Sequence, residues 1–189
     1  MLASVVVAKD SLPEDPLITI RNSLQLPHKL EIDKKYRENL EKICKGTATW
    51  ILERPEFESW SCGQKPVLTI RGSPGCGKSF LSTMVVKHIL ENKEKDMPIG
   101  YYYFRGDDES KQSVNNALCA MVYQIADQNA RFAERAARTC SELKNSLPAT
   151  LSSTWYDFFH ENFDSDSYSI SYFFSKQNIL LKFLFLFSN

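Results

Sequence analysis

The 189-residue sequence has no excess of charge of either sign. Lys and Arg together number 23, Asp and Glu also number 23, and the formal net charge is therefore zero. A protein that neutralises many phosphates along a nucleic acid needs a surplus of basic residues. The composition thus argues against a nucleic-acid partner held by bulk charge, while a local pocket for a single anion is compatible with it.

Paired cysteines with the spacing of metal ligands are also missing. The five cysteines are spread along the chain, and none of them forms a Cys-x-x-Cys pair with another. Neither a disulfide framework nor a zinc site is indicated, and this favours a reducing compartment. We therefore expect a cytoplasmic protein. The cysteines are Cys44, Cys62, Cys76, Cys119 and Cys140.

Long hydrophobic runs are absent at both ends of the sequence. The apolar residues 1–8 have no basic residue ahead of them and are followed by acids and prolines, unlike a secretory signal. Residues 170–187 are apolar on average, but lysines and amides interrupt them. The uninterrupted pieces are far shorter than the roughly 20 residues needed to cross a bilayer. We expect a soluble protein without a membrane partner.

The first third of the sequence is predicted to be helical after an irregular start. Residues 1–29 contain three prolines and little periodicity, and we interpret them as an irregular leader. Apolar residues then recur at helical spacing over residues 30–44. Within a helical segment at 30–62 we expect a short helix at 49–52 and another that begins at Pro55, a residue suited to a first helical turn.

The middle of the sequence alternates between strand and helix patterns. A β-branched run at 66–71 and an aromatic run at 99–104 are typical of buried parallel strands. Helical spacing covers residues 78–92 between them and about 110–128 after them. This order predicts an α/β protein in which helices and a parallel sheet form three layers, α/β/α, over residues 63–165. Further helices are expected at 130–143 and 154–163.

One segment carries a specific chemical pattern. Gly72-Ser-Pro-Gly-Cys-Gly-Lys-Ser79 fits the phosphate-binding P-loop, G-x-x-x-x-G-K-[ST], which is also called Walker A. It follows a predicted strand and opens a predicted helix, as the mechanism requires. If this segment is not a P-loop, the alternative interpretation is a glycine-rich turn with an exposed lysine and no binding function. A dinucleotide site is not supported, because Gly-x-Gly-x-x-Gly is missing at this turn.

Each position of this loop has a physical task. Glycines let the main chain adopt positive φ and approach an anion, so that successive N–H groups form a cradle for phosphate oxygens. Lys78 supplies a mobile cation for the β- and γ-phosphates at the positive end of the next helix. The Ser79 hydroxyl is an oxygen ligand for Mg²⁺. The predicted nucleotide-binding residues are Gly72, Gly75, Cys76, Gly77, Lys78, Ser79 and Phe80, and the predicted metal ligand is Ser79.

Other polar and aromatic residues are weaker candidates, and no catalytic residue is predicted. The acidic run at 107–109 is expected to cap a helix and not to bind a metal. The isolated histidines at 28, 88 and 160 are expected at the surface or in packing roles. Cys76 stands at a variable position of the loop, which disfavours a role as nucleophile. The tyrosines at 101–103 are explained by a buried strand more simply than by stacking on a base.

A complete P-loop NTPase has an acidic residue, the Walker B acid, that is missing from this sequence. Hydrolysis needs this acid at the end of a buried strand, where it holds the water shell of the metal. No run of four aliphatic residues followed by Asp or Glu occurs after Gly106, and a guanine-reading Asn-Lys-x-Asp is absent as well. We therefore expect nucleotide binding with impaired hydrolysis.

Four stretches of the sequence resemble a known family. Residues 44–52, 55–60, 67–81 and 101–104 are similar to the nephrocystin 3-like N-terminal domain. This domain belongs to the NACHT-like branch of the STAND P-loop NTPases, which are abundant in filamentous fungi. The resemblance covers about residues 30–160, and its Gly-Thr-x-x-Trp-Ile-Leu segment is more specific than the P-loop alone.

The resemblance implies an ATP-dependent molecular switch in which nucleotide binding controls assembly. ATP and Mg²⁺ are the implied cofactors, and a further copy of the chain or an effector domain is the implied protein partner. The phosphate and Mg²⁺ positions of the family correspond to Gly75, Gly77, Lys78 and Ser79. The segment that the family places near the base corresponds to Gly46, Thr47 and Trp50.

The end of the sequence departs from the family pattern. The family has a further hydrophobic strand and its Walker B acids at the place of residues 168–189. No glycine occurs after Gly106, and eight of the 12 phenylalanines lie in residues 155–189. We therefore interpret residues 166–189 as an atypical Phe-rich tail, foreign to a truncated domain whose sheet is incomplete.

Two alternative functions stay open from the sequence. A small P-loop nucleoside or metabolite kinase needs a basic lid, for which Arg131, Arg135 and Arg138 are the best residues. These arginines are explained more simply as the solvated face of a helix. The other alternative is a non-functional fragment, or one that only interacts with other proteins.

Overall fold

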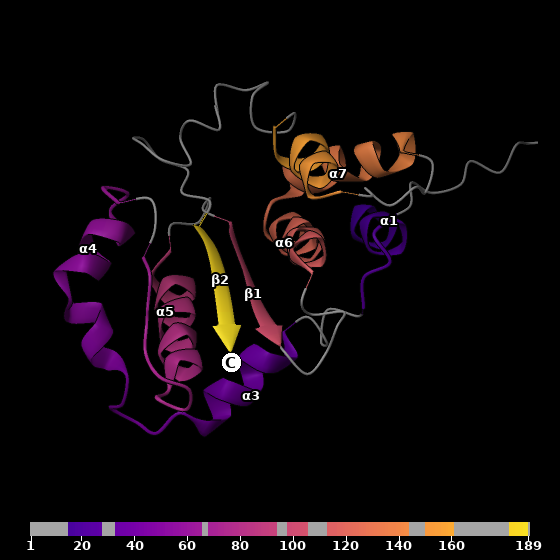
Figure 1. Ribbon diagram of the computed structural model, residues 1–189. Helices are drawn as coiled ribbons and strands as arrows, with labels where there is room; N and C mark the ends of the chain where they lie inside the picture. The colour runs from indigo at the N-terminus through magenta and orange to yellow at the C-terminus, as the bar shows by residue number, and fades with distance from the viewer. Residues whose placement is uncertain are drawn as a thin grey trace, which may run out of the picture.

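Most of the described chain is helical. The computed structural model describes residues 15–27, 33–65, 68–93, 98–105, 113–143, 150–160 and 182–188. Figure 1 shows how they are arranged. The elements are α1 (Pro16–Ser23), α3 (Lys34–Lys42), the 3₁₀ helix η1 (Thr49–Glu53), α4 (Pro55–Ser61), α5 (Lys78–Asn92), β1 (Ile99–Arg105), α6 (Val114–Gln128), α7 (Ala130–Glu142), α8 (Leu151–Trp155), the π-helical turn η3 (Tyr156–His160) and β2 (Lys182–Ser188).

The two strands form one parallel pair with helices on both sides. Ile99 of β1 lies opposite Lys182 of β2, and Arg105 lies opposite Ser188. Helices α4 and α5 lie on one side of the pair, and α1, α6 and α7 lie on the other (Figure 1). Within the described ranges this single pair is the only strand pairing, so the expected three-layer P-loop fold with its larger sheet is not shown.

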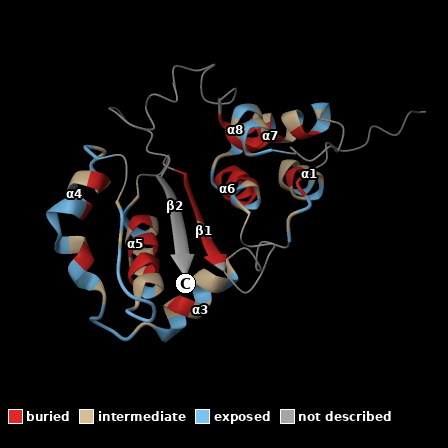
Figure 2. Cartoon of the chain, in the orientation of Figure 1, coloured by how far each residue is buried: buried red, intermediate tan, exposed pale blue. Residues whose placement is uncertain are grey.

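Both faces of β1 are covered, and Figure 2 shows that β1 and much of α5 and α6 are buried. Successive residues of a strand point to opposite faces. Tyr101 and Tyr103 accordingly pack with α5, whereas Tyr102 packs against the cluster around α6. The α5 cluster includes Phe57, Trp60, Val85, Val86 and Ile89, and the α6 cluster includes Ile20, Met121, Ile125, Phe158 and Phe159.

Several predicted elements are confirmed by the structure. A helical turn covers residues 49–53, and α4 begins at Pro55, which occupies its first turn. Helix α5 spans Lys78–Asn92 as predicted, and the predicted strand at 99–104 is β1. Helix α7 begins where Asn129 caps it, because the Asn129 side chain accepts a hydrogen bond from the N–H of Phe132 at 3.0 Å.

The prediction of an irregular leader is wrong for Pro16–Ser23, which form α1. The Asp15 carboxylate caps this helix by accepting from the N–H of Leu17 at 2.9 Å, and Pro16 follows at the first helical position. Eight residues are too few for a stable isolated helix. Contacts with α6 and α7 provide the stabilisation, since Ile20 is fully buried in the α6 cluster.

The prediction of a strand at 66–71 is wrong for residues 68–71, and residues 66 and 67 lie outside the described ranges. Leu68 and Ile70 are half-buried against the α5 cluster, while Thr69 and Arg71 are exposed. A β-branched run becomes a strand only beside a hydrogen-bonded neighbour. None of the described strands lies in register with this segment, so the apolar alternation is used for packing alone.

The predicted starts of two later helices also differ from the structure. Helix α6 begins at Val114 and not near residue 110, because Ser113 caps it by accepting from the N–H of Asn116 at 3.3 Å. The acidic run at 107–109, the expected cap of this helix, lies outside the described residues. Helix α8 begins at Leu151, ahead of the predicted 154, because Thr150 and Ser153 form a capping box.

Part of the Phe-rich tail belongs to the folded structure. Residues 182–188 form β2, which pairs with β1 along its whole length. The expectation that the tail is foreign to the domain therefore does not hold for these residues. A run of large apolar residues gains stability as a strand once another strand satisfies its main-chain hydrogen bonds.

Candidate functional site

The glycine-rich loop has the main-chain geometry expected for an anion cradle. Gly75 and Gly77 adopt φ values of 77° and 88°, in the left-handed region that favours glycine. Gly77 stands directly before the first residue of α5. The loop therefore brings its main chain to the positive end of a 15-residue helix.

Gly72 is required for space and not for its main-chain angles. A Cβ at this position would lie 2.5 Å from the Sγ of Cys76 and 3.9 Å from the Cγ of Lys78. The start and the end of the loop thus pack against each other at Gly72. The Cys76 thiol is otherwise exposed to solvent.

Lys78 ties the helix to the start of the loop. Its Nζ donates hydrogen bonds to the carbonyl oxygens of Gly72 and Ser73, both at 2.9 Å. The ammonium group therefore lies against the loop and is held by two neutral acceptors. Hydrogen bonds between a cation and an anion are stronger than those to neutral carbonyls, so a phosphate group can replace these two partners.

The two remaining predicted residues occupy the same first turn of α5. The Ser79 hydroxyl has no hydrogen-bond partner among the residues that the structure describes. Phe80 is 37% exposed, next to the loop. A free hydroxyl beside a cation at a helix N-terminus suits a ligand of Mg²⁺ bound together with a phosphate.

A buried polar network, which the sequence reasoning missed, fixes the position of this first turn. Thr83 is fully buried, and its hydroxyl donates to the carbonyl oxygen of Ser79 at 2.8 Å. The Thr83 hydroxyl oxygen in turn accepts from the Asn39 side-chain amide at 3.1 Å and lies 2.7 Å from the Tyr103 hydroxyl, which donates because the Thr83 proton is used. Burial raises the pKa of Tyr103 far above its ordinary value and keeps this group protonated.

Three elements are joined through Thr83, since Asn39 belongs to α3 and Tyr103 to β1. The loop at the head of α5 is consequently attached to a rigid support. The sequence contained one indication of this network. Thr83 and Asn39 are polar residues at positions that helical spacing places among apolar neighbours.

The segment before the loop packs beside α5. Gly46 and Ala48 both adopt positive φ, 79° and 62°, and the Thr47 hydroxyl donates to the Cys44 carbonyl at 2.7 Å. The turn places η1 beside α5. Ile51 of η1 is buried in the cluster of side chains around that helix. Trp50, in the same turn, is 55% exposed. The structure therefore brings the Gly-Thr-x-x-Trp segment close to the helix that carries Lys78.

A family model described as Nephrocystin 3, N-terminal, matches residues 46–178, which is well over half of the chain. The chain belongs to this nephrocystin 3 N-terminal family. The match begins at the turn before η1, contains the whole glycine-rich loop and ends within the Phe-rich tail. No curated protein and no solved structure matches the chain.

Other predicted residues of this nephrocystin 3-type domain lie away from the loop or in packing roles. Arg131 and Arg138 are exposed on α7, across the strand pair from α5. Arg135 belongs to the same helix, so none of the three arginines suggested as a kinase lid lies beside Lys78. Tyr101 is buried, as the strand interpretation predicted, and the ring of His88 packs against Phe57 with centroids 5.7 Å apart. His28 and the side chain of His160 lie outside the description.

The described part of this family member has neither a cluster of metal ligands nor a membrane-spanning helix. No group of three or more His, Cys, Asp or Glu side chains is arranged to hold a metal ion there. Among the same residues, no helix combines the length and the apolar character needed to traverse a bilayer.

Proposed function

We propose that the chain is the ATP-binding module of a STAND/NACHT-type signalling switch, with the phosphates held by the loop from Gly72 to Ser79. The observation that carries the proposal is the placement of Lys78, whose ammonium is held against the loop at the N-terminus of α5. Membership of the nephrocystin 3 N-terminal family supports it.

In this proposal each residue of the loop acts through a simple physical effect. The positive φ of Gly75 and Gly77 turns main-chain N–H groups toward an anion, and the helix dipole adds to their attraction. Lys78 exchanges two carbonyl acceptors for phosphate oxygens. Ser79 would hold Mg²⁺, and this ion supplies charge neutralisation between the β- and γ-phosphates when bound.

The exposed ring of Trp50 is the proposed platform for the adenine base. It lies on the turn that packs beside α5, and more than half of its surface is accessible. Stacking of a base on an aromatic ring contributes about 1–3 kcal/mol in proteins that bind single-stranded nucleic acids. The buried tyrosines of β1 offer no such surface, because Tyr101 and Tyr103 are only 7% and 5% exposed.

Hydrolysis of the bound nucleotide is proposed to be inefficient. An acid at the end of a strand near the loop holds the metal's water shell in complete P-loop NTPases. The strand that pairs with β1 reads Lys-Phe-Leu-Phe-Leu-Phe-Ser and contains no acid. A binding module of this kind acts through assembly with an effector domain or another copy of the chain, in the cytoplasm, and not through turnover.

Measuring ATP affinity of the full chain by calorimetry in the presence of Mg²⁺ tests this function. Lys78→Ala should weaken ATP binding by roughly 10- to 100-fold, since a charge-assisted hydrogen bond contributes about 1.5–3 kcal/mol. The matched control is Lys87→Ala, which removes a partly exposed lysine that pairs with Glu91 on the same helix. This control should bind ATP like the unmodified chain.

Equal ATP affinity in Lys78→Ala and the unmodified chain would refute phosphate binding by the loop. The claim about hydrolysis has a separate readout. Magnesium-dependent phosphate release at ordinary enzyme rates, about 1–1,000 per second, would overturn it without affecting the claim about binding.

A further inference from the structure

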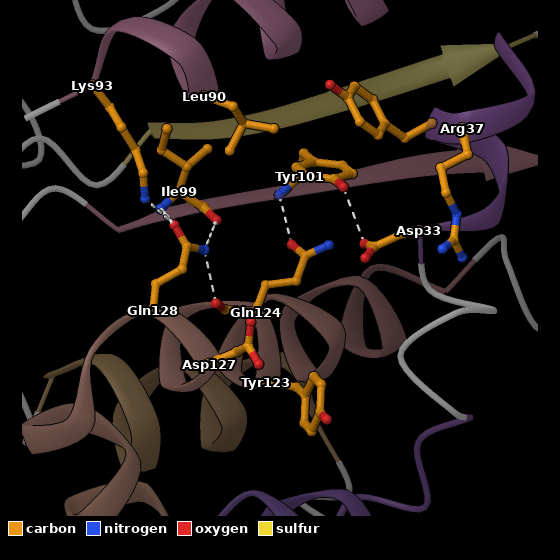
Figure 3. Close-up of a pocket in the computed structure, with 11 residues that line it drawn as sticks. Asp33, Arg37, Leu90, Lys93, Ile99, Tyr101, Tyr123, Gln124, Asp127 and Gln128 are labelled. Atoms are coloured by element: carbon orange, nitrogen blue, oxygen red, sulfur yellow. Dashed lines mark hydrogen bonds between the residues drawn. The ribbon is translucent and has the colours of Figure 1, made fainter. Parts of the chain in front are cut away.

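A pocket lies along the edge of β1 that β2 does not occupy. It has a volume of about 360 Å³, within the range of roughly 300–1,000 Å³ that is usual for small-ligand sites. Figure 3 shows the lining residues, which come from α3, α6, β1 and the end of α5. Because Lys93 lies just beyond the end of α5 and Lys78 begins it, about 20 Å of helix separates this pocket from the glycine-rich loop.

Two glutamines of α6 occupy the main-chain groups at this edge of β1. The Gln128 amide donates to the carbonyl oxygen of Ile99 at 2.7 Å and accepts from its N–H at 3.1 Å. One turn earlier, the Gln124 Oε1 accepts from the N–H of Tyr101 at 2.8 Å. The edge of β1 is thus satisfied by side chains, and an additional strand cannot pair there without displacing both of them.

The other half of the Gln124 amide has no partner. Gln124 is only 8% exposed, and its Nε2 is buried without any hydrogen bond. A buried donor without an acceptor is costly, and it is rare in native proteins. Gln124 lines the pocket, and Figure 3 shows its nitrogen on the side of Asp33. The pocket therefore offers an unused donor to whatever enters it.

The surroundings of this donor define the group that fits it. The Asp33 carboxylate lines the same pocket and accepts a hydrogen bond from the Tyr101 hydroxyl at 3.0 Å through one of its oxygens. An anionic acceptor beside Gln124 would lie next to the Asp33 carboxylate and be repelled by it, which favours a neutral acceptor. The carboxylate itself offers an acceptor to a donor on the ligand. A carbonyl next to an N–H meets both requirements.

The charged residues that line the pocket are balanced in number, with Arg37 and Lys93 opposed by Asp33 and Asp127. Leu90 and Ile99 supply an apolar wall. We propose that this pocket binds a planar amide, whose carbonyl accepts from Gln124 Nε2 and whose N–H donates to the Asp33 carboxylate. The amide belongs either to a small carboxamide or to a short stretch of peptide main chain, which share this chemistry.

Titration of the ¹⁵N-labelled full chain, followed through the side-chain amide resonances of Gln124, tests the proposal. The probes are acetamide, N-acetylglycine methylamide as a capped peptide, and acetate as the anionic control of the same shape. Both amides should shift the Gln124 resonances in a saturable manner, and acetate should not. Tighter binding of the capped peptide identifies peptide as the source, and tighter binding of acetamide identifies a small carboxamide.

Two variants and one control make the test specific. Gln124→Glu keeps the acceptor for the Tyr101 N–H and removes the donor, so affinity for both amides, read from the backbone resonances of β1, should fall at least tenfold. Asp33→Asn removes the negative charge, so acetate should now bind. Asp127→Asn, at the same pocket, should leave amide binding unchanged.

The proposal is overturned if acetate binds the unmodified chain as well as acetamide does, or if no probe shifts Gln124 and only water is found beside its Nε2. It is independent of nucleotide binding. Lys78→Ala should leave the titration with amides unaltered, so a failure at one site is distinguishable from a failure at the other.

Discussion

Cys119 and Cys140 differ from the other cysteines in one physical respect, their burial. They are 3% and 1% exposed, in the cluster around α6, and burial raises the pKa of each thiol to about 11. Cys44, Cys62 and Cys76 are exposed. A thiol reacts as its thiolate. The two buried thiols are therefore expected to react slowly, because they are inaccessible and because their raised pKa keeps the ionised fraction low.

Thiol labelling of the folded chain at pH 8 with a disulfide reagent should therefore show two classes of cysteine. The three exposed thiols should react quickly, and the two buried ones should react only after urea is added. In urea all five should react at similar rates, which serves as the control. Rapid reaction of all five thiols without urea would contradict the burial of Cys119 and Cys140.

Single residues of the loop were the most predictable part of the site. Positive φ at Gly75 and Gly77 follows from the pattern alone, since a chain that turns sharply before a helix needs glycine there. The contact of Gly72 with Cys76 could not be predicted in this way. It depends on how the two ends of the loop meet, and a linear pattern carries no distance between them.

At the scale of elements, Thr83 connects the loop helix α5 to α3 and β1. Its hydroxyl oxygen has three hydrogen-bonding neighbours, and none of the residues in this network is more than 5% exposed except Ser79. Removing a shared partner from a buried network leaves the other members unsatisfied. A substitution that removes one of these hydrogen-bonding groups is therefore expected to lower the stability of the fold, even when the side chain keeps its shape.

Thr83→Val should lower the free energy of unfolding by about 1–3 kcal/mol, because Asn39 and Tyr103 lose a buried partner while the volume is kept. Urea denaturation measures this loss. Tyr103→Phe provides a double-mutant cycle, in which the double variant should be less destabilised than the sum of the two single variants. Additive effects would show that Thr83 and Tyr103 do not interact.

Helices with a clear apolar stripe were predictable as elements, and weaker segments were not. The helical spacing of apolar residues in α5 and the aromatic run of β1 correspond to surfaces that are buried in the structure. Helix α1 has only eight residues and is stabilised by α6 and α7, which the local pattern does not contain. The run at 68–71 has strand composition but no neighbouring strand in register, so its propensity is not realised.

For the molecule as a whole, the pKa values of two buried cysteines and two buried tyrosines are shifted in one common direction. Burial raises the pKa of Cys119 and Cys140 to about 11 and also raises the pKa of the buried Tyr101 and Tyr103. A group with a raised pKa in the folded state contributes stability that is complete below its unfolded pKa. That contribution is lost as the pH rises toward the folded pKa, since the unfolded state releases its proton first.

The free energy of unfolding should accordingly be constant up to about pH 8.5, the ordinary pKa of cysteine, and should fall steadily toward pH 11. Urea midpoints measured by circular dichroism at a series of pH values test this. Cys119→Ala should make the fall shallower, whereas Cys44→Ala, at an exposed site, should leave its slope unchanged. A midpoint that stays level to pH 11 would rule out buried, protonated thiols in the fold.

The sequence by itself determined the family, the glycine-rich loop and the helices around it, because these depend on local spacing and on residue types that few other conformations accept. Tertiary structure alone decided that α1 folds, that β2 pairs with β1 and that Gln124 keeps an unused donor beside Asp33. Each of these depends on which surfaces meet. Contacts between segments that are far apart in the sequence do not alter the spacing of residues within either segment, so that spacing cannot predict them.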